Sequence, residues 1–257
     1  MTARVEKDLG FVLRKYNLRE TTIISTIYTK RFGKIKGILK GFHTQKKEFA
    51  TSMDTLTLNE FLFYPKRREI WLISFADLIE GYSFIRKDLA RAQSAAVFVH
   101  LLDKILPIWD SNAAVFDLIK ECLYYLETED ESKVLYVFLI KLLTFSGFKP
   151  EFDRCLRCHS NLGAKIFFSA SRGGLLCSNC CVAVSDVQSI SREVSSTILY
   201  IQNNDFPHVL RVKPTKYCER NILYILREFI FYHLDFDITR NNYRDTMLNY
   251  RKAEARN

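Results

Sequence analysis

Two Cys-x-x-Cys pairs constrain this chain more than any other feature of its sequence. The first pair is Cys155 and Cys158, and eighteen residues separate it from the second pair, Cys177 and Cys180. A two-residue gap lets both sulfurs of a tight turn point at one ion about 2.3 Å away, and the second pair completes a tetrahedron. Four thiolates leave no coordination position for water or substrate. The pattern therefore predicts one structural Zn²⁺ ion and not a catalytic metal.

Other roles for these cysteines are free buried thiols or a disulfide pair. Cys181 adjoins Cys180 and could replace it as a ligand, but the two-residue gap favours Cys180. His159 follows the first pair directly, and we expect it beside the site or in solvent rather than on the metal. Between the pairs, residues 165–169 predict a short strand, and Arg172-Gly-Gly predicts a turn, since glycine permits positive φ.

The composition predicts a cytoplasmic globular protein. The chain has 257 residues, of which 48% are hydrophobic and 26% charged, an ordinary globular balance. No apolar run approaches the roughly 20 residues of a membrane helix, and the first residues lack the apolar core of a secretory signal. Seven cysteines, an odd number with four in metal spacing, favour a reducing compartment over a disulfide framework.

Residues 1–78 are expected to form a small closed β-barrel. Five short runs rich in β-branched and aromatic residues predict its strands, at residues 10–16, 21–28, 33–39, 55–64 and 69–75. Five strands in about 80 residues fit the OB-fold, and an SH3-like barrel is the alternative. The first domain is therefore predicted as an OB-fold that binds nucleic acid.

After Ala76 the pattern changes to apolar residues at three- and four-residue spacing, which is typical of helices. Helices are predicted at about residues 89–102, 115–126, 131–145, 191–202 and 216–232. Cys122 and Cys218 fall within this pattern and are expected to be buried. The fold class is therefore α+β. A mostly helical domain at residues 79–238 carries the zinc module as an insertion at about 151–186, and a basic tail at 239–257 is expected to be mobile.

A run of cations lies inside the predicted barrel and contains no acidic residue. Its members are Lys30, Arg31, Lys34, Lys36, Lys40, Lys46 and Lys47, interleaved with the aromatic residues Tyr28, Phe32, Phe42 and Phe49. Proteins that bind single strands combine such cations, which follow phosphates, with rings on which bases stack. Strand alternation would place Lys34 and Lys36 on one exposed face. The alternative is a solvated barrel face whose aromatic residues are core.

Charge and missing motifs limit the functions that fit. The formal net charge of +9 favours a polyanionic partner. The sequence has no phosphate-binding loop and no His-Glu-x-x-His motif, and no histidine is followed two residues later by the glutamate of a zinc deaminase. We therefore expect no catalytic site, no ATP hydrolysis and no nuclease activity.

The order of barrel, helices, four-cysteine module and further helix resembles the bacterial RecO family of DNA repair and recombination mediators. The resemblance covers nearly the whole chain up to about Tyr232, and its most specific part is the Gly-Gly-Leu-Leu-Cys block with the cysteine pair before it. The motifs that carry it are Thr29-x-x-x-Gly33-Lys34-Ile35, Lys40-Gly41, Leu142-Leu143-x-x-x-Gly147-Phe148-x-Pro150, Cys155-x-x-Cys158 and Gly173-Gly174-Leu175-Leu176-Cys177-x-x-Cys180.

The resemblance implies an N-terminal OB-fold without catalytic activity that binds single- and double-stranded DNA and anneals complementary strands. It also implies that the protein, together with a RecR-like partner, helps a RecA-like recombinase onto strands covered by single-strand-binding protein. A location in the cytoplasm at the bacterial nucleoid is implied as well. Family members often continue the Lys-Gly of the barrel with an arginine-rich segment. Here Lys46 and Lys47 keep the charge without the arginine fork, so Lys40, Lys46 and Lys47 are expected to attract phosphates without bidentate contacts.

Three other functions share part of this pattern. An RNA-metabolism protein with an OB-fold and a zinc ribbon would have the same local features, and competition between single-stranded RNA and DNA would separate the two. An interaction adaptor without a nucleic-acid role would bind its partner with little dependence on salt. An enzyme would need a metal with an open coordination position.

Overall fold

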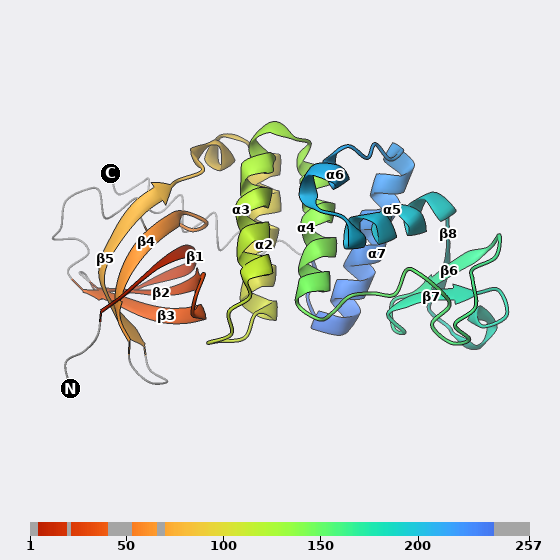
Figure 1. Cartoon of the computed structure of the whole chain (residues 1–257), viewed down its shortest axis with the longest axis horizontal. Helices are drawn as coiled ribbons and strands as arrows, with labels where there is room; N and C mark the ends of the chain where they lie inside the picture. Colours follow the sequence, from red (N-terminus) through yellow and green to blue (C-terminus); the bar gives the residue numbers. More distant parts are fainter. Residues whose placement is uncertain (1–4, 20–21, 41–52, 66–69, 239–257) are drawn as a thin grey trace. The chain divides into compact units, whose positions relative to one another are not determined.

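Unit 1 of the chain, residues 1–123, contains a closed five-stranded barrel (Figure 1). The computed structural model describes residues 5–19, 22–40, 53–65 and 70–238. The strands are β1 (Glu6–Arg19), β2 (Thr22–Thr29), β3 (Gly33–Lys40), β4 (Leu58–Tyr64) and β5 (Trp71–Glu80). They follow the order β1-β2-β3-β5-β4, with β4 paired back to β1 and a parallel pairing between β3 and β5. This is the five-stranded Greek-key barrel of an OB-fold, which confirms the predicted fold class.

The interior of the barrel follows from strand alternation. Ile23, Ile27, Ile35 and Leu39 point inward from β2 and β3 and pack with aromatic residues of β4. A Cβ atom at Gly37 in β3 would lie 2.5 Å from the Ile73 side chain, so a larger residue there would force Ile73 to shift. Packing of this kind gives the barrel a hydrophobic core of its own.

Two helices follow the barrel within unit 1, after a short 3₁₀ turn η1 (Ser83–Lys87): α2 (Leu89–Ile105), and α3 (Ala113–Thr128), which continues into unit 2. The segment between them pairs with β3, where the Trp109 N–H donates to the Lys34 carbonyl at 3.0 Å. Gly33 has φ +68° and lies against the backbone of Asp110, which no larger residue would allow. The helices are therefore fixed to the barrel through the start of β3.

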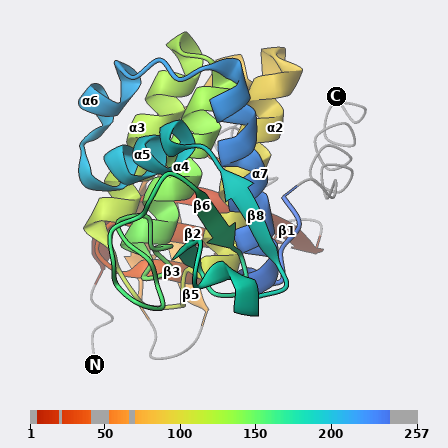
Figure 2. The ribbon, with the colours of Figure 1, turned by 90° about the vertical axis from the view of Figure 1, so that its right-hand side faces the viewer.

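Unit 2, residues 124–257, is built on helices. They are α4 (Glu131–Phe145), α5 (Arg192–Asn203), α6 (Phe206–Leu210) and α7 (Lys216–Leu234), and α4, α5 and α7 pack against one another (Figure 2). Two buried lysines of α4 donate to carbonyls at the ends of other helices. Lys141 donates to the Asn204 carbonyl, directly after α5, and Lys133 donates to the carbonyl of Leu210, the last residue of α6. The predicted helices are confirmed, and the short α6 was not predicted.

A small sheet lies between α4 and α5 in the sequence. Its strands β6 (Ile166–Ser169), β7 (Gly174–Cys177) and β8 (Val187–Ile190) are arranged β7-β6-β8, with a short 3₁₀ turn η2 (Cys181–Ala183) after β7. We call residues 151–190 the metal module. β6 matches the predicted strand at 165–169, whereas β7 and β8 were not predicted. Gly173, at φ +80°, forms the predicted turn between β6 and β7.

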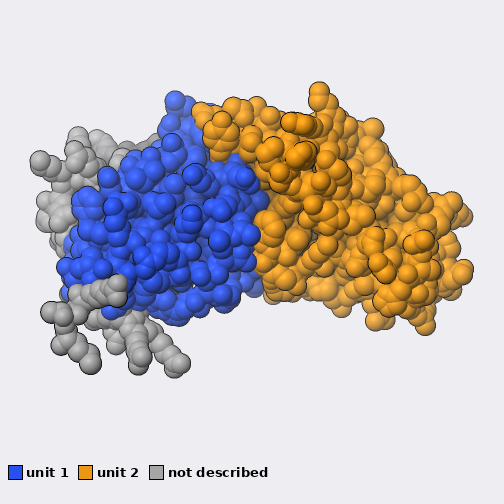
Figure 3. All heavy atoms as spheres, viewed as in Figure 1, with its two compact units in different colours: residues 1–123 blue, residues 124–257 orange. Residues whose placement is uncertain are grey.

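Figure 3 colours the two units separately, with residues 1–123 in blue and residues 124–257 in orange. In the part of the chain that the structure describes, no helix combines the length and the apolar character needed to cross a membrane.

Some residues of the cation run and the basic tail lie outside the described residues. They are Phe42, Lys46, Lys47, Phe49 and the tail at 239–257.

Candidate metal centre and nucleic-acid interface

The structure brings together the four cysteines that the sequence singled out. The Sγ atoms of Cys155, Cys158, Cys177 and Cys180 all lie within 4.8 Å of one another, and those of Cys158 and Cys177 are 3.8 Å apart. The corners of a tetrahedron with arms of about 2.3 Å are separated by about 3.8 Å. The four sulfurs can therefore surround one metal ion.

Local backbone contacts explain why the two pairs converge. The Cys155 N–H donates to the Ser160 carbonyl and the His159 N–H to the Cys155 carbonyl, which folds the first pair into a tight loop. Cys177 ends β7, and its N–H points at the Cys155 Sγ atom from 3.4 Å. The Cys180 N–H returns to the Cys177 carbonyl at 3.1 Å. His159 is exposed at φ 56°, as expected of a residue that turns the chain and does not bind the metal.

Cys181 occupies a different place from its neighbour. Its side chain is buried and its Sγ atom faces the Ser178 carbonyl at 3.2 Å, whereas Cys180 belongs to the sulfur cluster. The geometry therefore favours Cys180 over Cys181 as the fourth ligand.

Hydrogen bonds prepare two of the thiols for metal binding. Burial opposes ionisation of Cys155, but N–H donors from Cys158 and Cys177 outweigh it and lower the pKa of that thiol. Side-chain and backbone hydrogen bonds from Ser160 lower the pKa of Cys158 to about 6. Since the thiolate and not the thiol binds metal, these donors favour the ligand form.

The cysteines lie in a small apolar cluster. Cys155, Leu176 and Cys181 are its buried members, and the residues packed around them are only partly buried: Leu156, Leu162, Phe167, Cys177, Cys180, Val184 and Val187. Elsewhere in the module Phe152, Ile166, Phe168 and Leu175 are buried, and Phe152 stacks on Phe168. The Asp186 carboxylate accepts hydrogen bonds from the side chains of Ser169 and Ser171 and fixes the turn between β6 and β7. Contacts with two helices attach the module: Arg192 of α5 donates to the Gly163 carbonyl at 2.9 Å, and His233 of α7 lies 2.8 Å from the Ala170 carbonyl. Next to the module, Gln202 of α5 donates to the Pro150 carbonyl.

The cation run does not form one continuous surface, and the expectation that Lys34 is exposed is wrong. Lys34 does point out of the barrel, but α2 covers it and leaves only 8% of the residue exposed. Its Nζ atom donates to the Asp103 carbonyl at 2.6 Å and lies 3.6 Å from the Asp103 carboxylate. Burial lowers the pKa of Lys34. This lysine therefore joins the barrel to α2, and its charge is used inside the protein.

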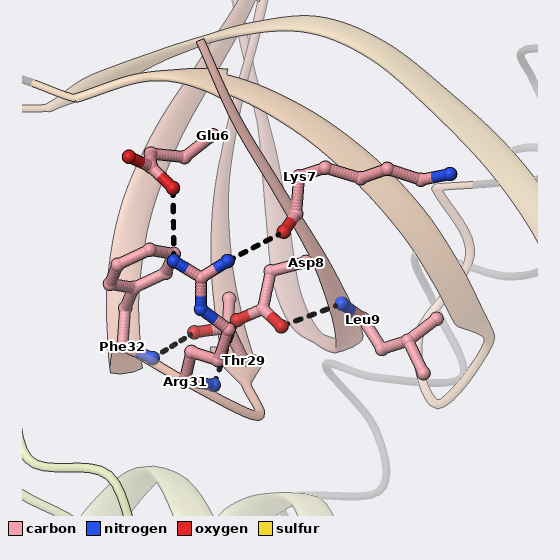
Figure 4. Close-up of polar contacts among 7 residues, drawn as sticks. All are labelled: Glu6, Lys7, Asp8, Leu9, Thr29, Arg31 and Phe32. Carbon is pink, nitrogen blue, oxygen red and sulfur yellow. Dashed lines mark hydrogen bonds and ion pairs between the residues drawn. The ribbon is translucent and has the colours of Figure 1, made fainter. Parts of the chain in front are cut away.

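Arg31 and Lys30 lie in the turn between β2 and β3. The Arg31 guanidinium is bound to the Glu6 carboxylate at 2.9 Å and the Lys7 carbonyl at 3.2 Å (Figure 4). The buried Asp8 carboxylate accepts the Arg31 N–H at 2.8 Å and fixes the same turn. Lys30 is exposed, with its Nζ atom 5.9 Å from the Phe116 ring centre. Both cations reach solvent, but Arg31 already has an acidic partner.

Lys36 and Lys40 are exposed on the outer side of β3. Together with residues of β1 and β2 they form what we call the β1–β3 face, defined by Arg14, Tyr16, Ile24, Lys36, Ile38 and Lys40. The pairing register places Tyr16 beside Ile24 and Ile24 beside Ile38. In the adjoining row, Thr26 lies between Arg14 and Lys36. Cations thus flank a partly exposed apolar row on strands β1, β2 and β3.

The two aromatic residues of the cation run that the structure describes, Tyr28 and Phe32, serve as core. Tyr28 is fully buried, and its hydroxyl donates to the Asn112 carbonyl at 3.1 Å. Phe32 is partly buried and packs against the barrel core. The exposed ring is instead Tyr16, which sequence reasoning missed; it is 53% exposed and its hydroxyl accepts from Arg14 at 3.2 Å. Alternation of Arg14, Tyr16 and Leu18 in β1 was the available signal, since every second residue faces outward.

Comparisons with known proteins identify the family. Residues 1–82 match the family model described as recombination protein O N terminal, and residues 86–241 match recombination protein O C terminal. Relatives named DNA repair protein RecO include that of Caldicellulosiruptor saccharolyticus, 29% identical across 90% of this chain and 94% of the relative. The Alkaliphilus metalliredigens relative is 26% identical across 89% and 94%, and that of Syntrophus aciditrophicus is 30% identical across 77% and 79%.

These comparisons agree with the closed barrel followed by helices and a four-cysteine cluster. They give no support to the RNA-metabolism hypothesis. The chain belongs to the recombination protein O (RecO) family of DNA repair proteins.

Proposed function

We propose that this protein is a non-catalytic recombination mediator that binds single- and double-stranded DNA through the β1–β3 face of its barrel. The observation that carries the proposal is the exposure of Lys36 and Lys40 on β3 and of Tyr16 on β1, with β2 paired between these two strands. OB-folds bind oligonucleotides on the face of strands 2 and 3. Lys30 and Arg31 lie at the turn that joins these strands, and Lys46 and Lys47 belong by sequence to the same cation run.

The chemistry of this face fits strand annealing. Lysine ammonium groups attract phosphates as point charges without reading the bases. A ring such as Tyr16 stacks on any base, because every base has a π-face. A strand held in this way keeps its base-pairing edges free for a complementary strand. We therefore propose annealing of complementary strands that depends weakly on sequence.

The same mode of binding fits a mediator that works with other proteins. We propose that this protein acts with a RecR-like partner on strands covered by single-strand-binding protein and helps a RecA-like recombinase onto them. Weak, charge-based contacts are suited to this task, because they can be exchanged for those of the recombinase.

We further propose that the metal is one structural Zn²⁺ ion held by Cys155, Cys158, Cys177 and Cys180. A closed set of four thiolates suits zinc and leaves no site for substrate. Metal analysis of protein purified under reducing conditions without chelator should give one zinc per chain. A zinc-free folded protein would refute this assignment without affecting the DNA proposal.

The DNA proposal is tested by titrating labelled single-stranded oligonucleotide with protein across a salt series. Each phosphate neutralised on a single strand contributes about −0.7 to the slope of log K against log salt. Changing Lys36 and Lys40 together to Ala should flatten that slope by about 1.4 and weaken all sequences alike. The control is Arg251→Ala with Lys252→Ala, which removes the same charge from the tail. Equal losses in both pairs would mean long-range attraction and would refute the site.

Stacking on Tyr16 has its own test. Tyr16→Ala should weaken single-strand binding by about 1–3 kcal/mol, roughly 5- to 150-fold, because one base loses its platform. Tyr16→Phe keeps the ring and should retain most of the affinity. If Tyr16→Phe loses as much as Tyr16→Ala, the hydroxyl and its contact with Arg14 matter instead of the ring.

A further inference from the structure

The four cysteines of the metal module differ in their access to solvent. Cys158 is exposed, Cys155 is buried, and Cys177 and Cys180 are partly buried. A small oxidant that approaches the cluster therefore meets the Cys158 sulfur first. Outside the cluster, Cys122, Cys181 and Cys218 are all buried and do not compete for it.

The neighbours of Cys158 favour reaction at this sulfur. The Ser160 hydroxyl lies 3.0 Å from its Sγ atom, and the Cys177 Sγ atom lies 3.8 Å away on the other cysteine pair. An exposed cysteine next to a second cysteine is the arrangement in which a sulfenic acid is captured as a disulfide. Cys177 stands in the position of the resolving cysteine.

We propose that Cys158 is a site of oxidation by hydrogen peroxide, and that this oxidation releases the metal. The Cys158 thiolate attacks one peroxide oxygen, the O–O bond breaks, and Cys158 sulfenic acid and hydroxide form. The Cys177 thiolate then attacks the Cys158 sulfur, an S–S bond forms, and a second hydroxide leaves. The two thiolates together lose two electrons, which reduce one peroxide molecule, and a thiol reductant reverses the change.

The consequence for the metal follows from its ligand count. A disulfide sulfur carries no charge to bind the ion, so the site falls from four thiolates to two and the metal leaves. The apolar cluster beside the metal is small, since only Cys155, Leu176 and Cys181 are buried in it. The part of the module around the cysteines and the module's contact with His233 of α7 are therefore expected to loosen, while the barrel of unit 1 keeps its own core.

This inference rests on the zinc assignment above, and the test separates the two. The zinc content of the purified protein is measured first, because protein without zinc refutes the assignment before any peroxide is added. Zinc-loaded protein is then treated with hydrogen peroxide, and released zinc is followed with a colorimetric chelator. We expect one zinc released per chain, a Cys158–Cys177 disulfide in the peptide mass map, and recovery with dithiothreitol and zinc.

Matched histidine variants locate the reactive sulfur. Cys158→His keeps a four-ligand site, since imidazole also binds zinc, but removes the exposed thiolate. Its zinc release should be at least tenfold slower than in the unmodified protein. Cys180→His keeps Cys158 and Cys177 and should release zinc at close to the unmodified rate. Equal rates in the two variants, or a disulfide that excludes Cys158, would overturn the proposal.

A second measurement needs no variant and covers the case in which Cys158→His does not fold. Zinc-loaded protein is treated briefly with peroxide and dimedone, which traps sulfenic acids, and labelled peptides are quantified over time. Cys158 should be labelled at least tenfold faster than any other cysteine. Labelling spread evenly over the four ligands, or fastest at another one, would refute the assignment of Cys158.

Discussion

The barrel of unit 1 and the metal module of unit 2 are both small β structures, but different forces hold them together. The barrel encloses large side chains such as Phe61, Phe63 and Ile27 with no exposed surface. Around its four cysteines the module buries only Cys155, Leu176 and Cys181, and the side chains packed against them are partly buried. A sheet too small to bury a sufficient core needs ligand bonds or cross-links instead. The comparison predicts that loss of the metal unfolds the module but not the barrel. It also predicts that a cavity in the barrel core destabilises the barrel but not the module.

Removal of the metal should produce the largest effect. Metal binding in small modules of this kind is worth about 10–16 kcal/mol, so the module is expected to unfold when the ion is chelated or when Cys177 is changed to Ser. Hydrogen exchange should show lost protection in residues 151–190 while β1–β5 stay protected. Equal loss of protection in both regions would break the comparison and make the barrel dependent on the metal.

A cavity in the barrel should produce the next largest effect, and here the barrel should lose stability while the module keeps its metal. Phe61 is fully buried and stacks on Phe63 with ring centres 5.3 Å apart, so Phe61→Ala should cost about 3–5 kcal/mol of unfolding free energy. Urea denaturation measures this cost, and zinc content should stay at one per chain. Ile79→Ala, at a residue 52% exposed on β5, is the control and should change stability by less than about 0.5 kcal/mol.

Lys34 and Lys36, which the sequence placed on one face, should differ in how much each contributes to the unfolding free energy. Lys34→Ala removes one hydrogen bond to the Asp103 carbonyl and an ion pair with the Asp103 carboxylate from a buried position, and it should cost about 1–3 kcal/mol. Lys36→Ala removes an exposed charge and should change the unfolding free energy by less than about 0.5 kcal/mol. Lys34→Met keeps the stem and distinguishes packing from charge. If Lys34→Ala and Lys36→Ala are equally stable, the contact with α2 does not support the barrel.

The smallest effect concerns the turn between β2 and β3 and depends on pH. Burial raises the pKa of Asp8, and this effect is larger than that of the hydrogen bonds from Arg31 and Leu9, which lower it. A carboxyl whose pKa is raised by folding adds stability when protonated, and this contribution is lost as the pH rises through the folded pKa. The stability of the unmodified protein relative to Asp8→Asn should therefore increase, on the order of 1 kcal/mol, as the pH falls from 7 to 4. Urea midpoints at both pH values measure it, and a pH-independent difference would contradict it.

The sequence predicted best where the signal is local. The cysteine pairs are set by a two-residue gap and a turn, so their convergence in space could be expected from residue type and spacing alone. The helix beginning after Asp130 and ending at Phe145 was predicted from apolar spacing, and its Asp130 cap accepts the Lys133 N–H as short-range chemistry requires. The same holds for Cys122 and Cys218, which helical spacing placed in the core and which are fully buried.

Prediction was less accurate where partners come from distant parts of the chain. β5 was expected to stop near Phe75, since the residues that follow have no strand alternation. It continues to Glu80 because Glu80 pairs with Leu58 of β4. The strands β7 and β8 were not predicted from their own residues, and both form by pairing with β6, which lies between them in the sheet.

The candidate sites divide in the same way. The sequence by itself determined the four-cysteine cluster, the OB-fold barrel and the excess of positive charge, because residue type and short spacing are enough for each. Only the tertiary structure decided which cations face solvent, since strand alternation gives a side chain's direction but not what covers it. Lys34 and Lys36 point the same way from β3, yet Asp103 of α2 binds Lys34, and Lys36 remains exposed. Tyr28 is buried beside Asn112 for the same reason, while Tyr16 is left outside.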